Sequence, residues 1–223
     1  MEPLNKMNKL YVFDFHGVLE TGTEYALLEV SNLALKSLNY SKQLSVNDAL
    51  KYYGLKWSEI FMNALGLNET QANNLYLECK RIDDLNPGII IKHTKQNKNA
   101  SKVLDEIIIQ HNDFILISNT RPKALNQFIK AANLENYFNE HNSFAVNTHE
   151  NGQELSKRIV LEKYLIKKTY EKIILIGDSK GDIELKNVSP NNSISILYSH
   201  PGIEFRECEP DYKIRDLMQI LKF

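Results

Sequence analysis

The chain has 223 residues, which exceeds one average domain of roughly 100–150 residues but falls short of two. Lysine plus arginine (27) nearly balance aspartate plus glutamate (28), so the net charge gives no reason to expect nucleic acid or a membrane surface as a partner. Residues 1–10 lack an apolar segment long enough for a signal peptide, and no run approaches the roughly 20 apolar residues of a membrane span. We therefore expect a cytoplasmic globular protein, in which the two distant cysteines form neither a disulfide framework nor a zinc site.

Five short apolar runs are candidate strands, and their unbroken apolarity predicts burial on both faces. They span residues 10–13, 114–117, 143–146, 173–176 and 194–198. Helical patterns over residues 101–110, 122–132 and 156–167 alternate with the later runs. This alternation predicts an α/β fold with a parallel, Rossmann-like five-stranded sheet.

Roughly 90 residues separate the first two predicted strands, far more than one crossover needs. This insert has an almost wholly helical pattern with recognisable helix starts, namely Thr21 with Glu24, Ser45 with Asp48, and Asn68 with Gln71. Gly54 and Gly66 are candidate helix ends, and Asn86-Pro87-Gly88 closes the insert. We predict a core domain of residues 1–20 and 92–223 and a helical cap of residues 21–91.

The first candidate site residue is Asp14, in the run LYVFDFHGVL at residues 10–19. It directly follows an apolar strand, and ligands of open α/β sheets bind at the carboxyl ends of strands. Taken alone, the motif is equally compatible with an aspartate that caps an ordinary turn.

Two later strands also end in polar residues. Ser118 and Asn119 follow the second strand, where a hydroxyl and backbone N–H groups can hold phosphate oxygens. Asp178 and Asp182 lie in the run IILIGDSKGD at residues 173–182, and carboxylates of this kind are ligands that Mg²⁺ prefers. Lys157, at the start of the helix before that strand, can offset phosphate charge, although most lysines in such positions are simply solvated.

The order Asp14, Ser118, Lys157 and Asp178 with Asp182, together with an early helical insert, resembles the haloacid dehalogenase-like hydrolase superfamily over nearly the whole chain. The resemblance implies that Asp14 is the nucleophile and forms an aspartyl-phosphate. It implies Mg²⁺ as cofactor, held by Asp14, by the main-chain carbonyl of His16, by Asp178 and by Asp182 directly or through water. It further implies that Ser118, Lys157 and the N–H groups of Gly17 and Asn119 bind the transferred phosphoryl group.

His16 departs from the pattern of the phosphatases that this chain resembles, which carry a second aspartate there as general acid and base. Imidazole titrates near neutral pH and can perform that step. Three outcomes stay open: His16 is the catalytic acid–base, another group or the substrate takes that role, or turnover is crippled. We slightly favour the catalytic role of His16 over the alternative of a ring that only fills the turn.

The leading functional hypothesis is a Mg²⁺-dependent phosphatase of a small phosphorylated metabolite, because an inserted cap that closes over the site would obstruct a large folded substrate. A second hypothesis is another reaction of the same family, cleavage of C–P or C–halogen bonds. The third is a metal- and phosphate-binding protein with little turnover. Glu20, just after the first motif, either meets a substrate cation or flanks the hinge between core and cap.

Overall fold

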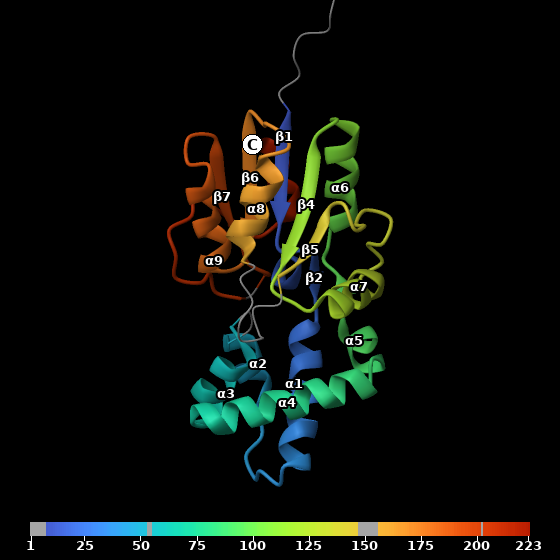
Figure 1. The fold of residues 1–223 in the computed structure, drawn as a ribbon, viewed down its shortest axis with the longest axis vertical. Coiled ribbons are helices and arrows are strands. Elements are labelled where there is room, and N and C mark those ends of the chain that lie inside the picture. Colours follow the sequence, from blue (N-terminus) through green and yellow to red (C-terminus); the bar gives the residue numbers. More distant parts are fainter. Residues whose placement is uncertain (1–7, 53–54, 147–155, 202) are drawn as a thin grey trace, which may run out of the picture. The chain divides into compact units, whose positions relative to one another are not determined.

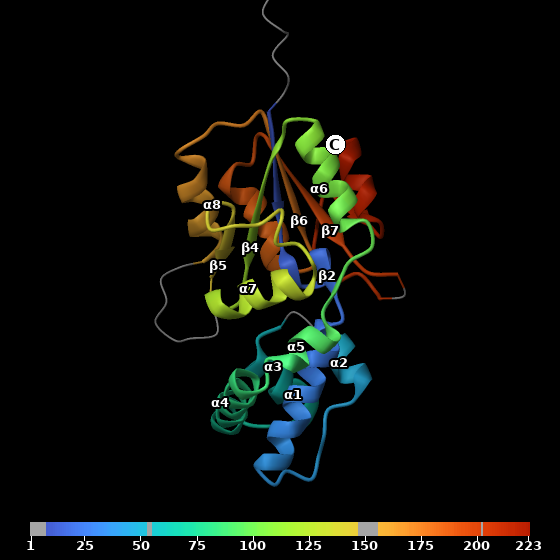
Figure 2. The same ribbon diagram turned by 90° about the vertical axis from the view of Figure 1, so that its right-hand side faces the viewer.

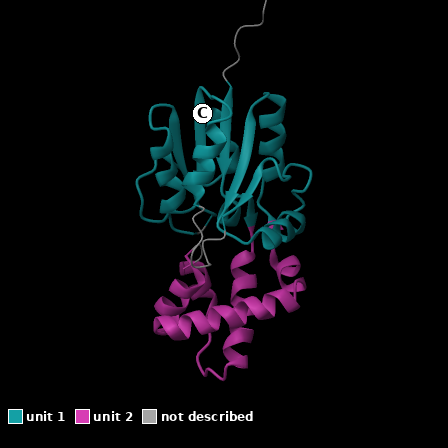
Figure 3. Cartoon of the chain, viewed as in Figure 1, with its two compact units in different colours: residues 1–20, 96–223 teal, residues 21–95 magenta. Residues whose placement is uncertain are grey.

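The computed structural model describes residues 8–52, 55–146, 156–201 and 203–223. The chain divides into two compact units, a core unit formed by Met1–Glu20 with Gln96–Phe223 and a helical unit formed by Thr21–Lys95 (Figure 3). No helix in the described ranges combines the length and apolarity that a membrane span requires.

The core unit is built on a six-stranded sheet in the order β5-β4-β1-β6-β7-β8, and all neighbouring strands are parallel (Figure 1). The strands are β1 (Lys9–Phe13), β4 (Asp113–Ser118), β5 (Ser143–Ala145), β6 (Lys172–Gly177), β7 (Ser193–Tyr198) and β8 (Tyr212–Ile214). The predicted α/β class with a parallel sheet is confirmed. The predicted number of five strands is wrong, because β8 has three residues, two of them exposed, and shows no apolar run.

Helices cover both faces of this sheet, with α8 on one face and α6 on the other (Figure 2). The helical segments of the core unit are η1 (Phe15–Leu19), α6 (Ala100–Ile109), α7 (Pro122–Ala131), α8 (Lys157–Leu165), α9 (Lys180–Ile183), η2 (Glu184–Val188) and η3 (Leu217–Lys222). Burial on both faces explains why the central strands are unbroken apolar runs. Leu10 and Val12 of β1 pack with Ile115 of β4 and Leu175 of β6 in one buried cluster.

The register of the central strands decides where the chain can place functional groups. Phe13, the last residue of β1, is paired with Leu116 of β4 on one side and with Ile176 of β6 on the other. Because the three strands are parallel, their carboxyl ends meet at one edge of the sheet. Residues that follow these strands are therefore brought together from three distant parts of the sequence.

The helical unit contains α1 (Thr23–Ser37), α2 (Val46–Tyr52), α3 (Trp57–Leu65), α4 (Glu69–Leu85) and α5 (Gly88–His93). The boundaries between the two units fall in β2 (Glu20–Thr21) and β3 (Lys95–Gln96), which form a separate two-stranded sheet. The apolar faces of α1, α3 and α4 share one core that includes Leu35, Phe61, Leu75 and Cys79. Burial raises the pKa of the Cys79 thiol, as expected for a cysteine that serves as a small core residue.

Two predicted helix starts and one predicted helix end of this unit are confirmed. Asn68 Oδ1 accepts the N–H of Gln71 at 2.9 Å and Gln71 Oε1 accepts the N–H of Asn68 at 3.1 Å, which is a reciprocal capping box. Ser45 and Asp48 cap the start of α2 in the same way. Gly66 ends α3 in the left-handed conformation with φ +72°. Gly54 lies outside the described residues.

Two predictions for the helical unit are wrong. The cap residue of α1 is Gly22, not Thr21, and Glu24 Oε2 accepts the N–H of Gly22 at 2.9 Å. The insert also continues past Asn86-Pro87-Gly88, because α5 begins at Gly88 and packs against α1. The second boundary between the units consequently lies between Lys95 and Gln96, not between residues 91 and 92.

Candidate active site

Asp14 directly follows β1 at the edge where the central strands end. Its N–H donates to the carbonyl of Ile176 at 2.9 Å, so the β1–β6 pairing continues up to this residue. Asp14 keeps an extended backbone, and its Oδ1 accepts the N–H of Phe15 at 2.8 Å as the chain turns into η1. The carboxylate is thereby fixed at the end of a rigid strand.

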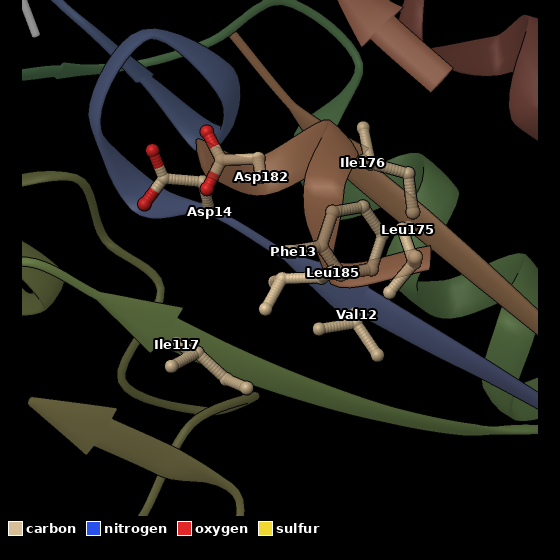
Figure 4. Close-up of a pocket in the computed structure, with 8 residues that line it drawn as sticks. All are labelled: Val12, Phe13, Asp14, Ile117, Leu175, Ile176, Asp182 and Leu185. Atoms are coloured by element: carbon tan, nitrogen blue, oxygen red, sulfur yellow. The ribbon is translucent and has the colours of Figure 1, made fainter. Parts of the chain in front are cut away.

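Three carboxylates gather at this position. Oxygen atoms of Asp14, Asp178 and Asp182 all lie within 4.8 Å of one another. Figure 4 shows Asp14 and Asp182 side by side at one end of a pocket whose other lining residues are apolar: Val12, Phe13, Ile117, Leu175, Ile176 and Leu185. A set of hard oxygen donors at this spacing fits a divalent cation such as Mg²⁺.

Lys157, the first residue of α8, brings a positive charge into this cluster. Its Nζ lies 2.8 Å from Asp14 Oδ1 and 2.6 Å from Asp182 Oδ1, and the residue is only 8% exposed. Burial by itself would lower the pKa of Lys157, but the two carboxylates outweigh it and raise the pKa above its ordinary value. The raised pKa keeps Lys157 a charged ammonium group at neutral pH.

Burial has the opposite consequence for the carboxylates. It raises the pKa of Asp14, against the attraction of Lys157, and it raises the pKa of Asp178 to about 7 despite the nearby guanidinium of Arg206. Arg206 Nη2 lies 3.1 Å from Asp178 Oδ2. Burial thus disfavours negative charge on these carboxylates, and a bound cation would stabilise that charge.

Two glycines permit the close approach of these groups. Gly17 has φ +74°, and a Cβ atom at this residue would lie 2.5 Å from Asp178 Oδ2. A Cβ atom on Gly177 would lie 2.0 Å from Cβ of Asp182. Neither position accepts a side chain without displacing a carboxylate of the cluster.

Ser118 is the last residue of β4 and is completely buried. Its Oγ has no hydrogen-bond partner in the described part of the chain. A buried hydroxyl without a partner costs free energy, so its presence beside the carboxylate cluster points to a ligand oxygen as the missing partner. Asn119, the other residue predicted here, follows it and is exposed.

His16 lies in η1, two residues after Asp14. Its Nδ1 lies 3.2 Å from Oε1 of Glu20, and its ring packs edge-on against Phe128 of α7 with centroids 4.6 Å apart. The N–H of Gly17 donates to the same Oε1 at 3.2 Å. In this structure the N–H of Gly17 is engaged by Glu20, and its predicted contact with a phosphoryl group stays a prediction.

The structure thus places Asp14, Lys157, Asp178 and Asp182 in direct contact or close to it, with Ser118 at the end of the neighbouring strand. Two partners were missed by the sequence analysis. Arg206 lies in the loop between β7 and β8, where no motif marks it. Glu20 was predicted to meet a substrate cation or to flank the hinge, and it is the last residue before the first boundary between the two units. Its pairing with His16 was not predicted, although a carboxylate four residues after a histidine was the available signal.

The parallel sheet carries a carboxylate cluster and a buried ammonium group at its carboxyl edge. The three carboxylates of this cluster could hold a cation, as in a hydrolase site. A family model described as haloacid dehalogenase-like hydrolase matches residues 11–187. The protein belongs to this family, as the sequence motifs predicted. No curated protein matches the chain in sequence.

Solved structures with the same fold cover nearly the whole chain. A predicted phosphoglycolate phosphatase from Haemophilus somnus 129PT is 19% identical, with a TM-score of 0.73 over 98% of both chains. A predicted phosphatase from Clostridium acetobutylicum is 17% identical, with a TM-score of 0.69 over 97% of both chains. A family hydrolase from Deinococcus radiodurans R1, solved with bound phosphate and sodium, is 12% identical, with a TM-score of 0.67 over 96% of this chain and 93% of that one.

Proposed function

We propose that the protein is a Mg²⁺-dependent phosphatase that acts on a small phosphorylated metabolite through a covalent intermediate on Asp14. The observation that carries the proposal is the contact of Lys157 with both Asp14 and Asp182, inside a cluster of three carboxylates. A cationic group next to the attacking carboxylate is what nucleophilic attack on an anionic phosphate ester requires.

The residues that would hold the metal are Asp14, Asp178 and Asp182, with the main-chain carbonyl of His16. Bound Mg²⁺ would neutralise negative charge on the carboxylates and on the phosphoryl oxygens. The oxygen-only side chains of the cluster favour Mg²⁺ over softer metals.

Asp14 supplies the nucleophile. Its Oδ1 is held by the N–H of Phe15 and by Lys157, which leaves Oδ2 to attack phosphorus. The new bond joins this oxygen to phosphorus, the bond from phosphorus to the ester oxygen breaks, and the leaving alcohol takes a proton from an acid in the site. Water then attacks the same phosphorus, releases inorganic phosphate and returns the free carboxylate of Asp14.

Ser118 and Asn119 bind the transferred phosphoryl group. The buried hydroxyl of Ser118, which lacks a partner among the described residues, supplies a donor at the end of β4. This hydroxyl and the carboxylate cluster favour a phosphate ester, because a donor and a divalent cation both stabilise the charged oxygens of a phosphoryl group, whereas cleavage of a C–halogen bond requires no cation. The Deinococcus relative was solved with phosphate bound, which supports the same ligand class.

His16 is the acid that protonates the leaving alcohol and the base that later activates water. Its ring is held by Glu20 and Phe128, so it is oriented rather than free to rotate. The substrate is a small phosphate monoester, a class to which the phosphoglycolate in the name of the Haemophilus relative belongs.

Hydrolysis of a panel of small phosphate monoesters with added Mg²⁺ tests the proposal. We expect turnover that EDTA abolishes and that Asp14→Asn reduces to background, since the amide cannot attack phosphorus. Asp105→Asn, an equal loss of charge at an exposed position on α6, is the matched control and should retain wild-type turnover. Hydrolysis that persists in Asp14→Asn would exclude the covalent mechanism, and tight phosphate binding without turnover would instead favour a binding protein.

A further inference from the structure

The ring of His16 is fixed on several sides within the core unit. Its Nδ1 faces Glu20 Oε1 at 3.2 Å. Phe128 meets the ring edge-on at a centroid distance of 4.6 Å and an angle of 87°, and Phe15 does so at 5.3 Å and 88°. The side chain of His16 nevertheless stays 20% exposed. One edge of the ring is therefore bound to protein while the residue still reaches the surface of the site.

Glu20 is an unusual partner because it is a completely buried carboxylate. Residues such as glutamate are rarely buried in full unless they are paired. The backbone around Glu20 is anchored, since the N–H of Asn97 donates to the carbonyl of Leu19 at 2.9 Å. A carboxylate that is held in place by its surroundings can fix the orientation of the imidazole ring of His16.

The direction of the hydrogen bond follows from a second donor on the same atom. Glu20 Oε1 also accepts the N–H of Gly17 at 3.2 Å. An oxygen that accepts from a backbone N–H and faces an imidazole nitrogen is an acceptor for both groups, so Nδ1 of His16 carries the proton. Nε2 is then the nitrogen with the free lone pair in the neutral ring, and it has no partner among the described residues.

We propose that Glu20 is a positioning residue that holds His16 in its Nδ1–H tautomer and so makes Nε2 the nitrogen that exchanges a proton with the leaving-group oxygen. This inference rests on the proposed phosphatase function. Where the phosphatases that the chain resembles have a single aspartate, this chain has a histidine with a buried carboxylate behind it. The carboxylate supplies orientation that an isolated imidazole on a turn would lack.

The tautomer is measurable without any activity. Two-bond ¹H–¹⁵N correlation spectra of the full-length protein, recorded at a pH at which the ring is neutral, distinguish a protonated from an unprotonated ring nitrogen. His16→Asn assigns the signals by their disappearance. We expect a protonated Nδ1 and an unprotonated Nε2 for His16. An Nε2–H tautomer, or averaged signals from a ring that exchanges between both forms, would overturn the proposal.

A double-mutant cycle separates positioning from a merely structural role. Glu20→Gln should lower kcat about 10–100-fold, as loss of a partner behind a reacting group commonly does, and should leave KM within about twofold. His16→Asp replaces the imidazole by the aspartate of the resembled phosphatases, so in that background Glu20→Gln should change kcat by less than about threefold. An equal loss in both backgrounds would show that Glu20 only supports the fold.

Failure of this inference and failure of the proposed function give different results. A wild-type protein without phosphatase activity would refute the function, whereas a protonated Nδ1 in the same sample that is lost in Glu20→Gln would still show that Glu20 sets the tautomer of His16. An active wild-type enzyme with an Nε2–H tautomer would leave the function standing and refute the role of Glu20.

Discussion

The Nζ atom of Lys157 lies 2.8 Å from Oδ1 of Asp14, in a pair whose members are each about one-tenth exposed. Lys157 begins α8 and Asp14 follows β1, so the contact joins elements that are distant in the sequence. Because water is largely excluded, the charge of each group depends on the other. We therefore expect that loss of either member lowers the activity of the protein.

Lys157→Met should reduce kcat for phosphate-ester hydrolysis about 10²–10³-fold, the usual effect of removing one preorganised electrostatic contact. Methionine keeps most of the length of the side chain but leaves Asp14 and Asp182 without their shared cation. Steady-state kinetics with saturating Mg²⁺ provides the measurement. Lys163→Met, on the exposed part of the same helix, is the matched control and should retain full activity. Equal activity of the two variants would contradict the role of Lys157.

Ser118→Ala should weaken binding of inorganic phosphate without lowering stability. The hydroxyl is buried and has no partner in the described ranges, so its removal relieves a desolvation cost instead of breaking a bond. Isothermal titration calorimetry reports the affinity, and denaturant unfolding reports the free energy of unfolding.

Ser195→Ala is the control for a strand serine that does have a partner. Ser195 Oγ lies 3.0 Å from Asp211 Oδ2 and accepts the N–H of Asp211 at 3.1 Å. Its loss should lower the free energy of unfolding by about 1 kcal/mol and leave phosphate affinity unchanged. If Ser118→Ala were the more destabilising of the two variants, the hydroxyl would have a structural partner after all.

The structural features that depend on a local sequence pattern could be predicted from the sequence. Asp14, Ser118 and Asp178 each follow an apolar run, and parallel pairing brings the ends of β1, β4 and β6 to one edge of the sheet. The capping box of Asn68 with Gln71 could also be predicted from the sequence, since its two residues are three positions apart.

Features set by tertiary contact were not predictable in the same way. The strand β8 lies at the edge of the sheet beside β7 and has two exposed residues, so no apolar run marks it. Arg206 reaches Asp178 from a loop without a motif. The pairing of His16 with Glu20 depends on the turn at Gly17, whose positive φ lets the chain fold back by four residues.

Gly17→Ala should abolish or strongly weaken Mg²⁺ binding, because the added Cβ would meet Oδ2 of Asp178 at 2.5 Å. Gly66→Ala is a control with nearly the same backbone conformation, φ +72°, and no atom within 4 Å of the added Cβ. Both variants incur about 1–2 kcal/mol of backbone strain, but only the first displaces a carboxylate. Calorimetric titration with Mg²⁺ should separate them, and an equal affinity in both would show that Asp178 does not hold the metal.

Mg²⁺ binding should weaken as the pH falls through about 7, where the buried carboxyl of Asp178 titrates in the metal-free protein. Burial raises this pKa above the ordinary value near 4, so the folded state binds the proton more tightly than the unfolded state does. The resulting contribution to stability is fully present below about pH 4 and is lost as the pH rises through about 7.

Without metal, the free energy of unfolding should therefore decrease as the pH rises from about 4 to about 7. Added Mg²⁺ should restore it near pH 7 and above. Metal affinity should fall about tenfold per pH unit below the pKa, because the cation must displace the proton. Arg206→Gln provides the control: the guanidinium lowers the pKa of Asp178, so its removal should shift the midpoint of the affinity profile to higher pH. A profile that is flat between about pH 6 and pH 8, or a midpoint that the substitution leaves unmoved, would show that a group other than Asp178 controls the cation.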